Sequence, residues 1–219
     1  MAASSAKTDP APVPRGGRRN RELEVIDAAV DVFWRKGFPA ASIQDVADQV
    51  GVLKGSLYHY IDSKEELLFR IFDESHRQAW VIVEEVGALD APALERLRIY
   101  IERYLAWYLQ NLERVSLYFT EWRHLTGERL ETVIEQRHGY ERFLRDLIKE
   151  AQKSGEVSPN LNLTHAMSYI YGGIQNAPVW YRREGPDSPE QIAASYADMT
   201  LGLLTGTKPR KRRRARKSS

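Results

Sequence analysis

Cysteine is absent from the 219 residues of this chain. Without thiols the protein can form neither disulfide bonds nor thiolate metal sites, and such chains are typical of a reducing compartment. Long apolar runs are also absent, since no segment approaches the roughly 20 apolar residues of a membrane span. Residues 1–14 lack the apolar core of a signal peptide. We therefore expect a globular cytoplasmic protein without a membrane partner.

Acidic residues are scarce at both ends of the chain. Residues 1–21 have five basic side chains and one acidic one, and residues 208–217 have eight basic and none acidic. Since the whole chain has a net charge of +2, the remaining residues carry −10. We expect a disordered basic arm at 1–21 and a disordered basic tail at 208–219. Both are candidate phosphate contacts, because clustered Lys and Arg release counterions from a polyanion. For the tail, a purely solubilising role is an equal alternative.

Strand-like alternation is missing, and apolar residues recur at helical spacing instead. The expected fold class is all-α, with a three-helix head at 22–69 and a larger helical body at 70–207. In the head we expect helices from about 22 to 36, at 43–50 and at 53–60, and a long fourth helix runs from 64 to about 86 into the body. In the body we expect helices at 92–111, 113–125, 128–154, 163–183 and 189–204.

The head contains a pattern typical of a helix-turn-helix. Ser42 stands at an N-cap position with Asp45 three residues later, and Gly51 separates two short helices. In that geometry the second helix enters the major groove of DNA. We assign Leu57 to the core. The residues expected to contact DNA are Ser42, Gln44, Lys54, Gly55, Ser56, Tyr58, His59, Tyr60 and Lys64.

The head is acidic, which is unusual for a DNA-binding unit. Residues 22–80 contain eleven acidic and six basic side chains. The basic arm could compensate by lying along the DNA backbone or in the minor groove. Our hypothesis is therefore that operator affinity depends on the arm.

The segment SIQDVADQVGVLKGSLYHYIDSKEELL, residues 42–68, resembles the DNA-binding head of the TetR family of bacterial repressors. It departs from the family pattern at Leu53, where a helix-capping Ser or Thr is common, and at Ile61. The resemblance implies a regulator that binds double-stranded operator DNA. It also implies release by a small-molecule inducer.

Aromatic residues concentrate in the first half of the body. Tyr100, Tyr104, Trp107 and Tyr108 share one helix face, and Tyr118 with Trp122 forms a second group. Such faces are usually core, but their hydroxyl and N–H groups need partners, so a partly polar cavity is an equal alternative. Nearby arginines could bind an anionic ligand or lie on a solvated helix face. The expected ligand-binding residues are Tyr104, Trp107, Tyr108, Tyr118, Trp122, Arg123, Arg137, Gln175 and Trp180.

The body also resembles TetR-type regulators of fatty-acid and sterol breakdown. The likeness lies in residues 118–123 and 137–140, with Gly173, Trp180 and Gly185 further on. It implies an acyl-CoA thioester as inducer, bound in a long apolar cavity with a basic entrance. No cofactor is implied.

The last two expected helices each have an apolar face. One face contains Ala166, Met167, Ile170, Ile174 and Ala177, and the other contains Ile192, Tyr196, Met199 and Leu203. Gly172 and Gly173 permit close helix approach. We expect a homodimer through these helices, which would place two heads on a palindromic operator. An intramolecular core is the alternative, and one helix can serve both.

An enzymatic function is not expected. Glu121-x-x-His124 and Glu135-x-x-His138 repeat the pattern of di-iron helical bundles. With a turn at Thr126, however, the two histidines lie roughly 12 Å apart in height at 1.5 Å per residue, so they cannot share one metal pair. We expect no metal site. The remaining alternative is an architectural DNA-binding protein, which would bind without sequence preference and with a steep salt dependence.

Overall fold

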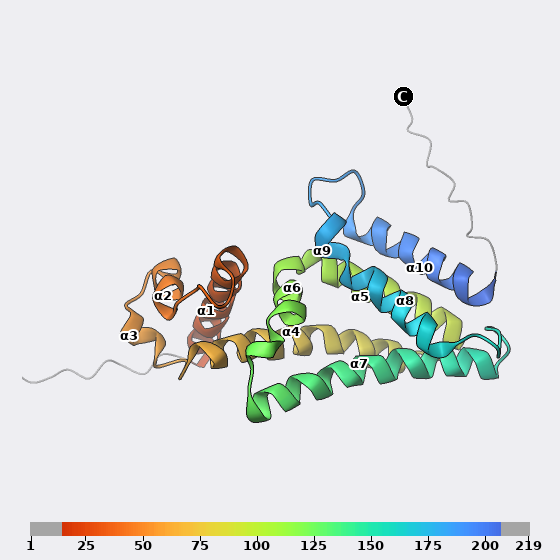
Figure 1. Cartoon of the computed structure of the whole chain (residues 1–219), viewed down its shortest axis with the longest axis horizontal. Helices are drawn as coiled ribbons and strands as arrows, with labels where there is room; N and C mark the ends of the chain where they lie inside the picture. Colours follow the sequence, from red (N-terminus) through yellow and green to blue (C-terminus); the bar gives the residue numbers. More distant parts are fainter. Residues whose placement is uncertain (1–14, 207–219) are drawn as a thin grey trace, which may run out of the picture. The chain divides into compact units, whose positions relative to one another are not determined.

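The computed structural model describes residues 15–206, which form helices and turns without a strand (Figure 1). The all-α fold class is therefore confirmed. The first fourteen residues of the expected arm and the basic tail at 208–219 lie outside the described residues. The helices are α1 (Arg15–Lys36), α2 (Ile43–Val50), α3 (Lys54–Leu57), α4 (Lys64–Gly87), α5 (Ala93–Gln110), α6 (Leu112–Thr120), the 3-10 helix η1 (Trp122–His124), α7 (Gly127–Lys153), α8 (Leu163–Gln175), α9 (Ala177–Trp180) and α10 (Pro189–Thr205).

The chain divides into two compact units, residues 1–68 and 69–219. Helix α4 is continuous across this division: its first turn belongs to the first unit and the remainder to the second. The two units therefore share one unbroken helix.

The first unit is built from α1, α2 and α3 around a small apolar core. Helix α1 packs against α2, and α2 against α3. The rings of Phe33 and Phe38 meet edge to face with centroids 5.1 Å apart. Leu57 is only 1% exposed and belongs to this core, as expected. Since α2 and α3 each bury one face, their opposite faces are available to another molecule.

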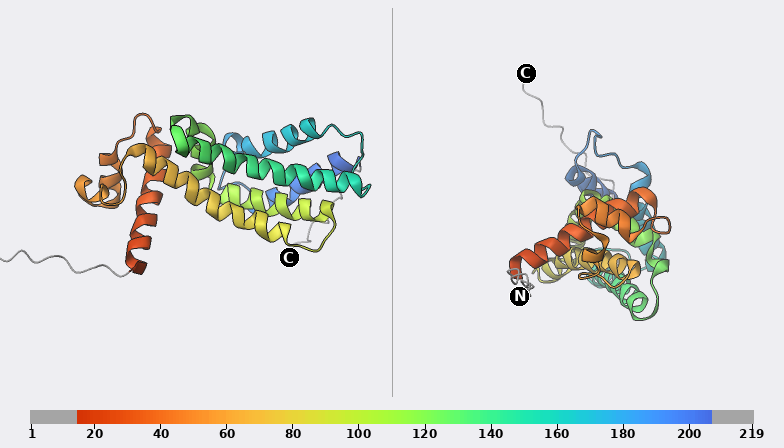
Figure 2. Two further views of the ribbon diagram at one scale, coloured as in Figure 1. Left: turned by 90° about the horizontal axis from the view of Figure 1, so that it is seen from below. Right: turned by 90° about the vertical axis from the view of Figure 1, so that its left-hand side faces the viewer.

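The second unit is a helical bundle in which α10 packs along α5, α5 along α7, and α7 along α8. Ala193 and Ala197 are fully buried, and such small side chains let α10 approach α5 closely. An ion pair of 2.6 Å between Arg98 and Asp198 joins the same two helices. Figures 1 and 2 show the body part of α4 beside α7. The core includes Leu97, Tyr100, Ile101, Leu105, Tyr108, Leu144 and Ile148.

Two expected boundaries in the head are wrong. Helix α1 begins at Arg15, so residues 15–21 of the expected arm are helical. Arg21 pairs with Glu24 at 2.6 Å across one helical turn, and this pair supports the extension. Helix α3 covers only Lys54–Leu57 rather than 53–60. Its N-cap, Leu53, provides no side-chain hydrogen bond, and Gly55 lowers the helix propensity.

Two expected helices of the body are interrupted. The segment expected at 113–125 ends as α-helix at Thr120 and continues as the tight turn η1. The segment expected at 163–183 stops at Gln175, and a short α9 follows. Pro178 has no N–H to donate to the carbonyl oxygen of Ile174, and its ring would clash with that carbonyl in a continuous helix. The proline therefore explains the second interruption.

The helices of 17 or more residues, α1, α4, α5, α7 and α10, all contain charged residues. In α7, the longest with 27 residues, acidic and basic side chains occur in almost every turn. Across residues 15–206, no helix combines the length and the apolar character needed to cross a membrane.

Candidate functional sites: the helix-turn-helix head and the cavity of the body

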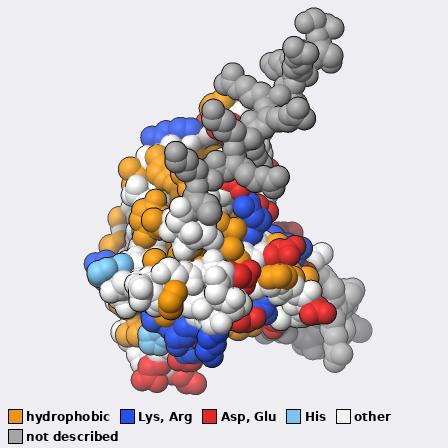
Figure 3. Space-filling model, turned by 90° about the vertical axis from the view of Figure 1, so that its right-hand side faces the viewer, with side chains coloured by type: hydrophobic (Ala, Val, Ile, Leu, Met, Phe, Trp, Pro, Cys, Tyr) orange, Lys and Arg blue, Asp and Glu red, His pale blue; other side chains and the backbone are white. Residues whose placement is uncertain are grey.

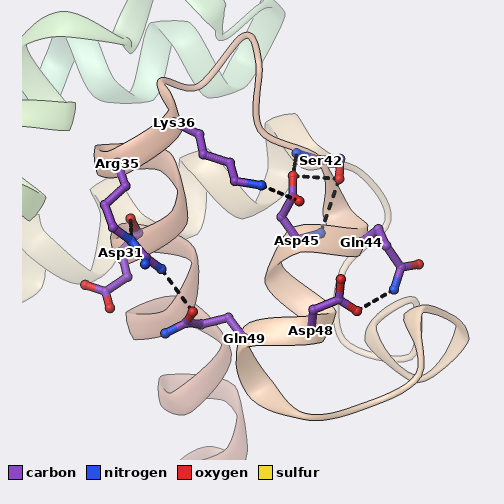
Figure 4. Close-up of polar contacts among 8 residues, drawn as sticks. All are labelled: Asp31, Arg35, Lys36, Ser42, Gln44, Asp45, Asp48 and Gln49. Carbon is purple, nitrogen blue, oxygen red and sulfur yellow. Dashed lines mark hydrogen bonds and ion pairs between the residues drawn. The ribbon is translucent and has the colours of Figure 1, made fainter.

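Ser42 begins α2 through a capping box (Figure 4). Its Oγ accepts a hydrogen bond of 3.2 Å from the Asp45 N–H, and the Asp45 carboxylate accepts one of 2.8 Å from the Ser42 N–H. Gly51 ends the helix with φ of +75°, a conformation that glycine adopts without strain. The sequence predicted both ends of α2, and the structure confirms them.

Replacing Ser42 separates its capping role from the expected DNA contact. Asn is as good an N-cap as Ser, whereas Ala costs about 1 kcal/mol. The Ser42 hydroxyl also donates a hydrogen bond of 2.8 Å to the Asp45 carboxylate, and the amide of Asn can replace this donor. We expect Ser42→Asn to retain the stability of the protein but to weaken DNA binding, because the larger side chain would displace a nearby phosphate. Ser42→Ala should lower stability by about 1 kcal/mol. Urea unfolding and DNA titration check both. Unchanged DNA affinity in Ser42→Asn would contradict a contact at this position.

Polar contacts tie α1 to α2 (Figure 4). Lys36 Nζ binds the Asp45 carboxylate at 2.6 Å, and Arg35 donates a hydrogen bond of 3.0 Å to the Gln49 side chain. The hydrogen bonds from Lys36 and Ser42 lower the pKa of Asp45 to about 2. The carboxylate therefore stays ionised at neutral pH and holds α2 in place. Gln44 is exposed and donates to Asp48 at 2.7 Å.

The residues around α3 provide the exposed surface expected of a recognition element. Lys54, Gly55, Tyr58 and His59 are exposed, and Ser56 and Tyr60 are partly exposed. No heavy atom lies within 4 Å of a Cβ placed on Gly55, so the head itself does not require glycine there. These side chains remain the predicted DNA contacts.

Leu53 is a candidate contact that the sequence did not single out. It is 81% exposed, which is unusual for a leucine directly before a recognition helix. An apolar side chain at this place can contact the methyl group of thymine. The sequence contained one signal for this contact. Position 53 is Leu, whereas a helix-capping Ser or Thr is common there in the TetR family.

Lys64 lies in a different environment from the one expected. Its Nζ donates to the Pro39 carbonyl oxygen at 3.3 Å and sits 4.3 Å from the centre of the Phe38 ring. The ammonium group therefore braces the connection between α1 and α2. Contact between Lys64 and phosphate remains a prediction. To make this contact, the ammonium group would have to exchange these interactions for one with DNA.

The second unit contains a cavity of about 390 Å³. It lies among α5, α6, α7 and α8. Four of the expected ligand-binding residues line it: Tyr104, Tyr118, Arg137 and Gln175. Its other lining residues are Phe119, Tyr140, Glu141, Arg145, Thr164, Met167, Ser168, Tyr171 and Gly172.

The cavity combines neutral phenols with a partly buried cationic group. Burial raises the pKa of Tyr104, Tyr118, Tyr140 and Tyr171, so these side chains stay protonated and can donate hydrogen bonds. Arg137 has a buried Nη1 without a hydrogen-bond partner. Its guanidinium carbon lies 5.5 Å from the centre of the Phe119 ring and 5.2 Å from that of Trp122. The cavity can therefore hold an apolar group together with an anionic oxygen.

Two expected ligand contacts on α5 lie outside this cavity. Tyr108 is fully buried in the core and stacks on Phe119 with centroids 6.1 Å apart. Trp107 lines a separate small cavity beside α4. Both share a helix face with Tyr104, so the face was predicted correctly but the boundary between core and cavity was not.

Three further expected contacts are also outside the cavity. Trp122 touches Arg137 without lining the space. Arg123 lies in η1 and is exposed, because the tighter turn changes the direction of its side chain from that in an α-helix. Trp180 is 36% exposed and stacks on Tyr196 at 5.7 Å.

The missed lining residues come mainly from α7 and α8. Thr164, Ser168, Tyr171 and Gln175 are spaced at i, i+4, i+7 and i+11, which places them on one face of α8. This polar stripe was the signal that could have identified them. It was missed because the apolar stripe of the same helix was considered instead.

The apolar face of α8 expected at a dimer interface is buried within its own unit. Ala166, Met167, Ile170, Ile174 and Ala177 are all at most 5% exposed. A Cβ on Gly173 would lie 3.3 Å from the Tyr196 ring, so this glycine allows α8 and α10 of one chain to pack together. Gly172 has no such neighbour. The intramolecular alternative is therefore correct for this face.

A different part of α8, α9 and α10 is apolar and exposed. Trp180 of α9 stacks on Tyr196 of α10 with ring centroids 5.7 Å apart. Figure 3 shows hydrophobic side chains gathered on one side of the face that it draws, with charged side chains around them. The exposed apolar surface, here called the α8–α10 patch, consists of Tyr169, Val179, Trp180, Met199 and Leu203.

His76 on α4 is half-buried beside α7. Burial lowers its pKa below the ordinary value, and the charge of Asp73 partly opposes this. Glu131, Glu135 and Arg142 face the same space from α7. The folded protein therefore resists protonation of this imidazole.

The lowered pKa of His76 predicts that stability rises with pH. Below about pH 6.5 the unfolded chain binds a proton that the folded chain excludes, so acidification favours unfolding. We expect His76→Asn to reduce the loss of unfolding free energy between pH 7.5 and 5.5, measured with urea. His165→Asn, at an exposed position, is the control and should leave that loss unchanged. An equal loss in wild type and His76→Asn would contradict the assignment.

Several proteins of known sequence or structure are similar to this chain. The HTH-type transcriptional repressor KstR2 of Mycobacterium tuberculosis is 28% identical over 195 residues, which cover 87% of this chain and 96% of that protein. Its solved structure has a TM-score of 0.79 at 24% identity, covering 84% of this chain and 95% of that one.

Two further solved structures share the fold. AibR, in complex with isovaleryl coenzyme A and operator DNA, has a TM-score of 0.74 at 23% identity and covers 86% of this chain and 100% of its own. FadR from Bacillus subtilis, in complex with stearoyl-CoA, has a TM-score of 0.66 at 24% identity and covers 82% and 97%.

Family patterns match both units. Residues 90–204 match the tetracyclin repressor-like C-terminal domain, and residues 25–71 match the bacterial regulatory proteins of the tetR family. Together with the helix-turn-helix head and the helical body, these matches identify the family. The chain belongs to the tetR family of bacterial regulatory proteins.

Proposed function

We propose that this chain is a transcriptional repressor that binds a palindromic operator as a homodimer and is released by a small apolar metabolite in the cavity of the body. The candidate class of metabolite is an acyl-CoA thioester. The observation that carries the proposal is the cavity itself, in which aromatic walls surround the unpartnered Nη1 of Arg137. Buried cationic groups are normally paired, so an Nη1 without a hydrogen-bond partner beside a cavity favours an anionic ligand.

The chemistry of an acyl-CoA suits such a site. Its acyl chain is apolar and can contact rings such as Phe119 and Tyr104, while its phosphates can bind Arg137 or Arg145 at the cavity wall. AibR and FadR, which share the fold, were solved with isovaleryl coenzyme A and stearoyl-CoA respectively. These complexes support the choice of ligand class.

The proposed dimer uses the α8–α10 patch. Exposed apolar surface of this kind typically marks a protein interface. A two-fold axis at the patch would present two heads to two half-sites. A ligand can release DNA only if it binds the non-binding arrangement of the heads more tightly. Helix α4 is the candidate element for transmitting ligand binding to the head, since it is continuous between the two units.

Selection of bound sequences from random DNA tests the proposal. We expect one palindromic consensus, and we expect isovaleryl-CoA or stearoyl-CoA to release it in a gel-shift titration. An architectural DNA-binding protein would instead enrich no sequence and would show only a steep salt dependence. A consensus without release by any acyl-CoA of 4 to 18 carbons would keep the repressor and reject the ligand class.

Arg137→Met tests the role of the guanidinium in ligand binding. A charge-assisted hydrogen bond typically contributes about 1.5–3 kcal/mol, so we expect acyl-CoA to bind roughly tenfold to 100-fold more weakly. Arg142→Met is the matched control, because Arg142 lies on the same helix, pairs with Glu135 at 2.7 Å and does not line the cavity. Calorimetric titration measures both. Equal loss in the two variants would indicate a general effect of charge.

A further inference from the structure

We propose that Tyr140 and His76 form the junction through which a ligand in the cavity acts on α4. This inference rests on the proposed function and names the residues that would transmit its signal. Tyr140 lines the main cavity and also the small cavity beside α4, which His76 lines as well. The side chain therefore forms part of the wall between the ligand space and α4.

Tyr140 is bonded to His76 through two contacts at one oxygen. Its Oη lies 3.0 Å from His76 Nδ1 and 3.3 Å from the His76 carbonyl oxygen. A hydroxyl has one proton and two lone pairs, so both contacts are satisfied if Nδ1–H donates to Oη and Oη–H donates to the carbonyl oxygen. Tyr140 thus holds both the side chain and the backbone of one residue of α4.

The surroundings make this junction rigid. The Trp80 ring lies 5.2 Å from His76 and 5.3 Å from Tyr140, measured between centroids. A Cβ on Gly139 would lie only 3.0 Å from two ring atoms of Trp80, so α4 and α7 approach closely beside Tyr140. The packed rings leave little room for Tyr140 to move without moving α4.

Other cavity residues are less suited to this role. Tyr118 touches Phe72 of α4 through its ring, but its hydroxyl donates to Val133 on α7. Tyr104 lines both cavities without a hydrogen bond to α4 among the described residues. Tyr140 combines a place in the cavity wall with hydrogen bonds to α4. Through those bonds, a ligand that shifts the Tyr140 ring would displace His76 and favour another position of α4.

The main experiment compares His76→Phe with His76→Asn in the full-length protein. Phe keeps the ring packing but removes Nδ1, whereas the Asn amide can restore a donor close to its position. For each protein we measure the dissociation constant of stearoyl-CoA and of isovaleryl-CoA, and the factor by which saturating ligand weakens operator binding. Since His76 does not line the main cavity, ligand affinity serves as the internal control.

We expect ligand affinity within about threefold of wild type in both variants. The release factor, typically 5-fold to 150-fold for allosteric proteins, should fall at least tenfold or vanish in His76→Phe and return within about threefold in His76→Asn. An unchanged release factor in His76→Phe would overturn the proposal. Equal loss in both variants would also overturn it, because it would indicate a packing effect.

A second measurement requires neither ligand nor DNA. Met167→Trp fills the cavity from α8, since Met167 is buried and lines it. We expect it to reduce the hydrogen-exchange protection of α4 amides at 73–80 about tenfold in wild type, but less than twofold in the His76→Phe background. The same change in both backgrounds would refute the junction. If neither acyl-CoA binds, the proposed ligand class fails. The hydrogen-exchange measurement still decides whether the junction transmits a change in the cavity to α4.

Discussion

Replacing Met199 and Leu203 together by glutamate is expected to convert the protein to a monomer and to weaken operator binding at least about 1000-fold. Both side chains are 47% exposed in the α8–α10 patch. Burying two carboxylates in each half of an apolar interface costs far more free energy than the apolar contacts of the interface contribute. A monomer would engage one half-site only and would lose the high effective concentration of the second head.

The matched control for this prediction is Val81→Glu. Val81 is 48% exposed on α4 and lies outside the α8–α10 patch, so its substitution adds the same kind of charge elsewhere. Light scattering measures the oligomeric state, and fluorescence anisotropy measures operator affinity. If the double variant remains a dimer with full operator affinity, the interface lies on another surface.

Replacing Lys54 and Tyr58 together by alanine should weaken operator binding about 100-fold or more. Base or phosphate contacts are each worth roughly 1–3 kcal/mol, and a dimer would lose every contact twice. Both side chains are exposed, so folding should be unaffected. Loss of Lys54 should also reduce the salt dependence of binding, because fewer counterions are released.

Lys149→Ala is the control for this substitution. Lys149 is about half exposed on α7, and its replacement removes the same charge from the body. Operator titrations at several salt concentrations separate the two effects. Operator affinity within twofold of wild type in the Lys54 and Tyr58 double variant would show that DNA is recognised through other residues.

The local rules of helix formation explain why the head was predictable. Ser42, Asp45 and Gly51 specify the ends of α2 through interactions within a few residues, and all three act as expected. The end of α8 also had a local cause in Pro178, but the apolar periodicity on both sides of it outweighed that signal in the sequence. The sequence therefore predicted the helix ends where local signals agreed with the apolar pattern, and failed where the two competed.

The cavity was only partly predictable, for a physical reason. Tyr104 and Tyr108 lie one helical turn apart on the same face of α5, yet one lines the cavity and the other is fully buried in the core. Periodicity indicates which face is buried. It does not indicate where opposing side chains fail to fill the space, because this depends on residues of α7 and α8 that are distant in sequence.

The same limit applies to the dimer surface. An apolar stripe on α8 predicted burial correctly, but whether a chain buries it alone or with a second copy depends on neighbouring helices. Gly173 decides this, since its missing side chain lets Tyr196 of the same chain cover α8. The exposed Tyr169 and Val179 then remain for another partner.

The continuity of α4 has a consequence for how this protein can evolve. Each residue added to a helix advances the rest of the helix by about 1.5 Å and rotates it by about 100°. An insertion within α4 would therefore change the orientation of one unit relative to the other. Loops such as the one at 184–187 can change length without this effect. We expect relatives to vary in such loops while the length of α4 stays fixed.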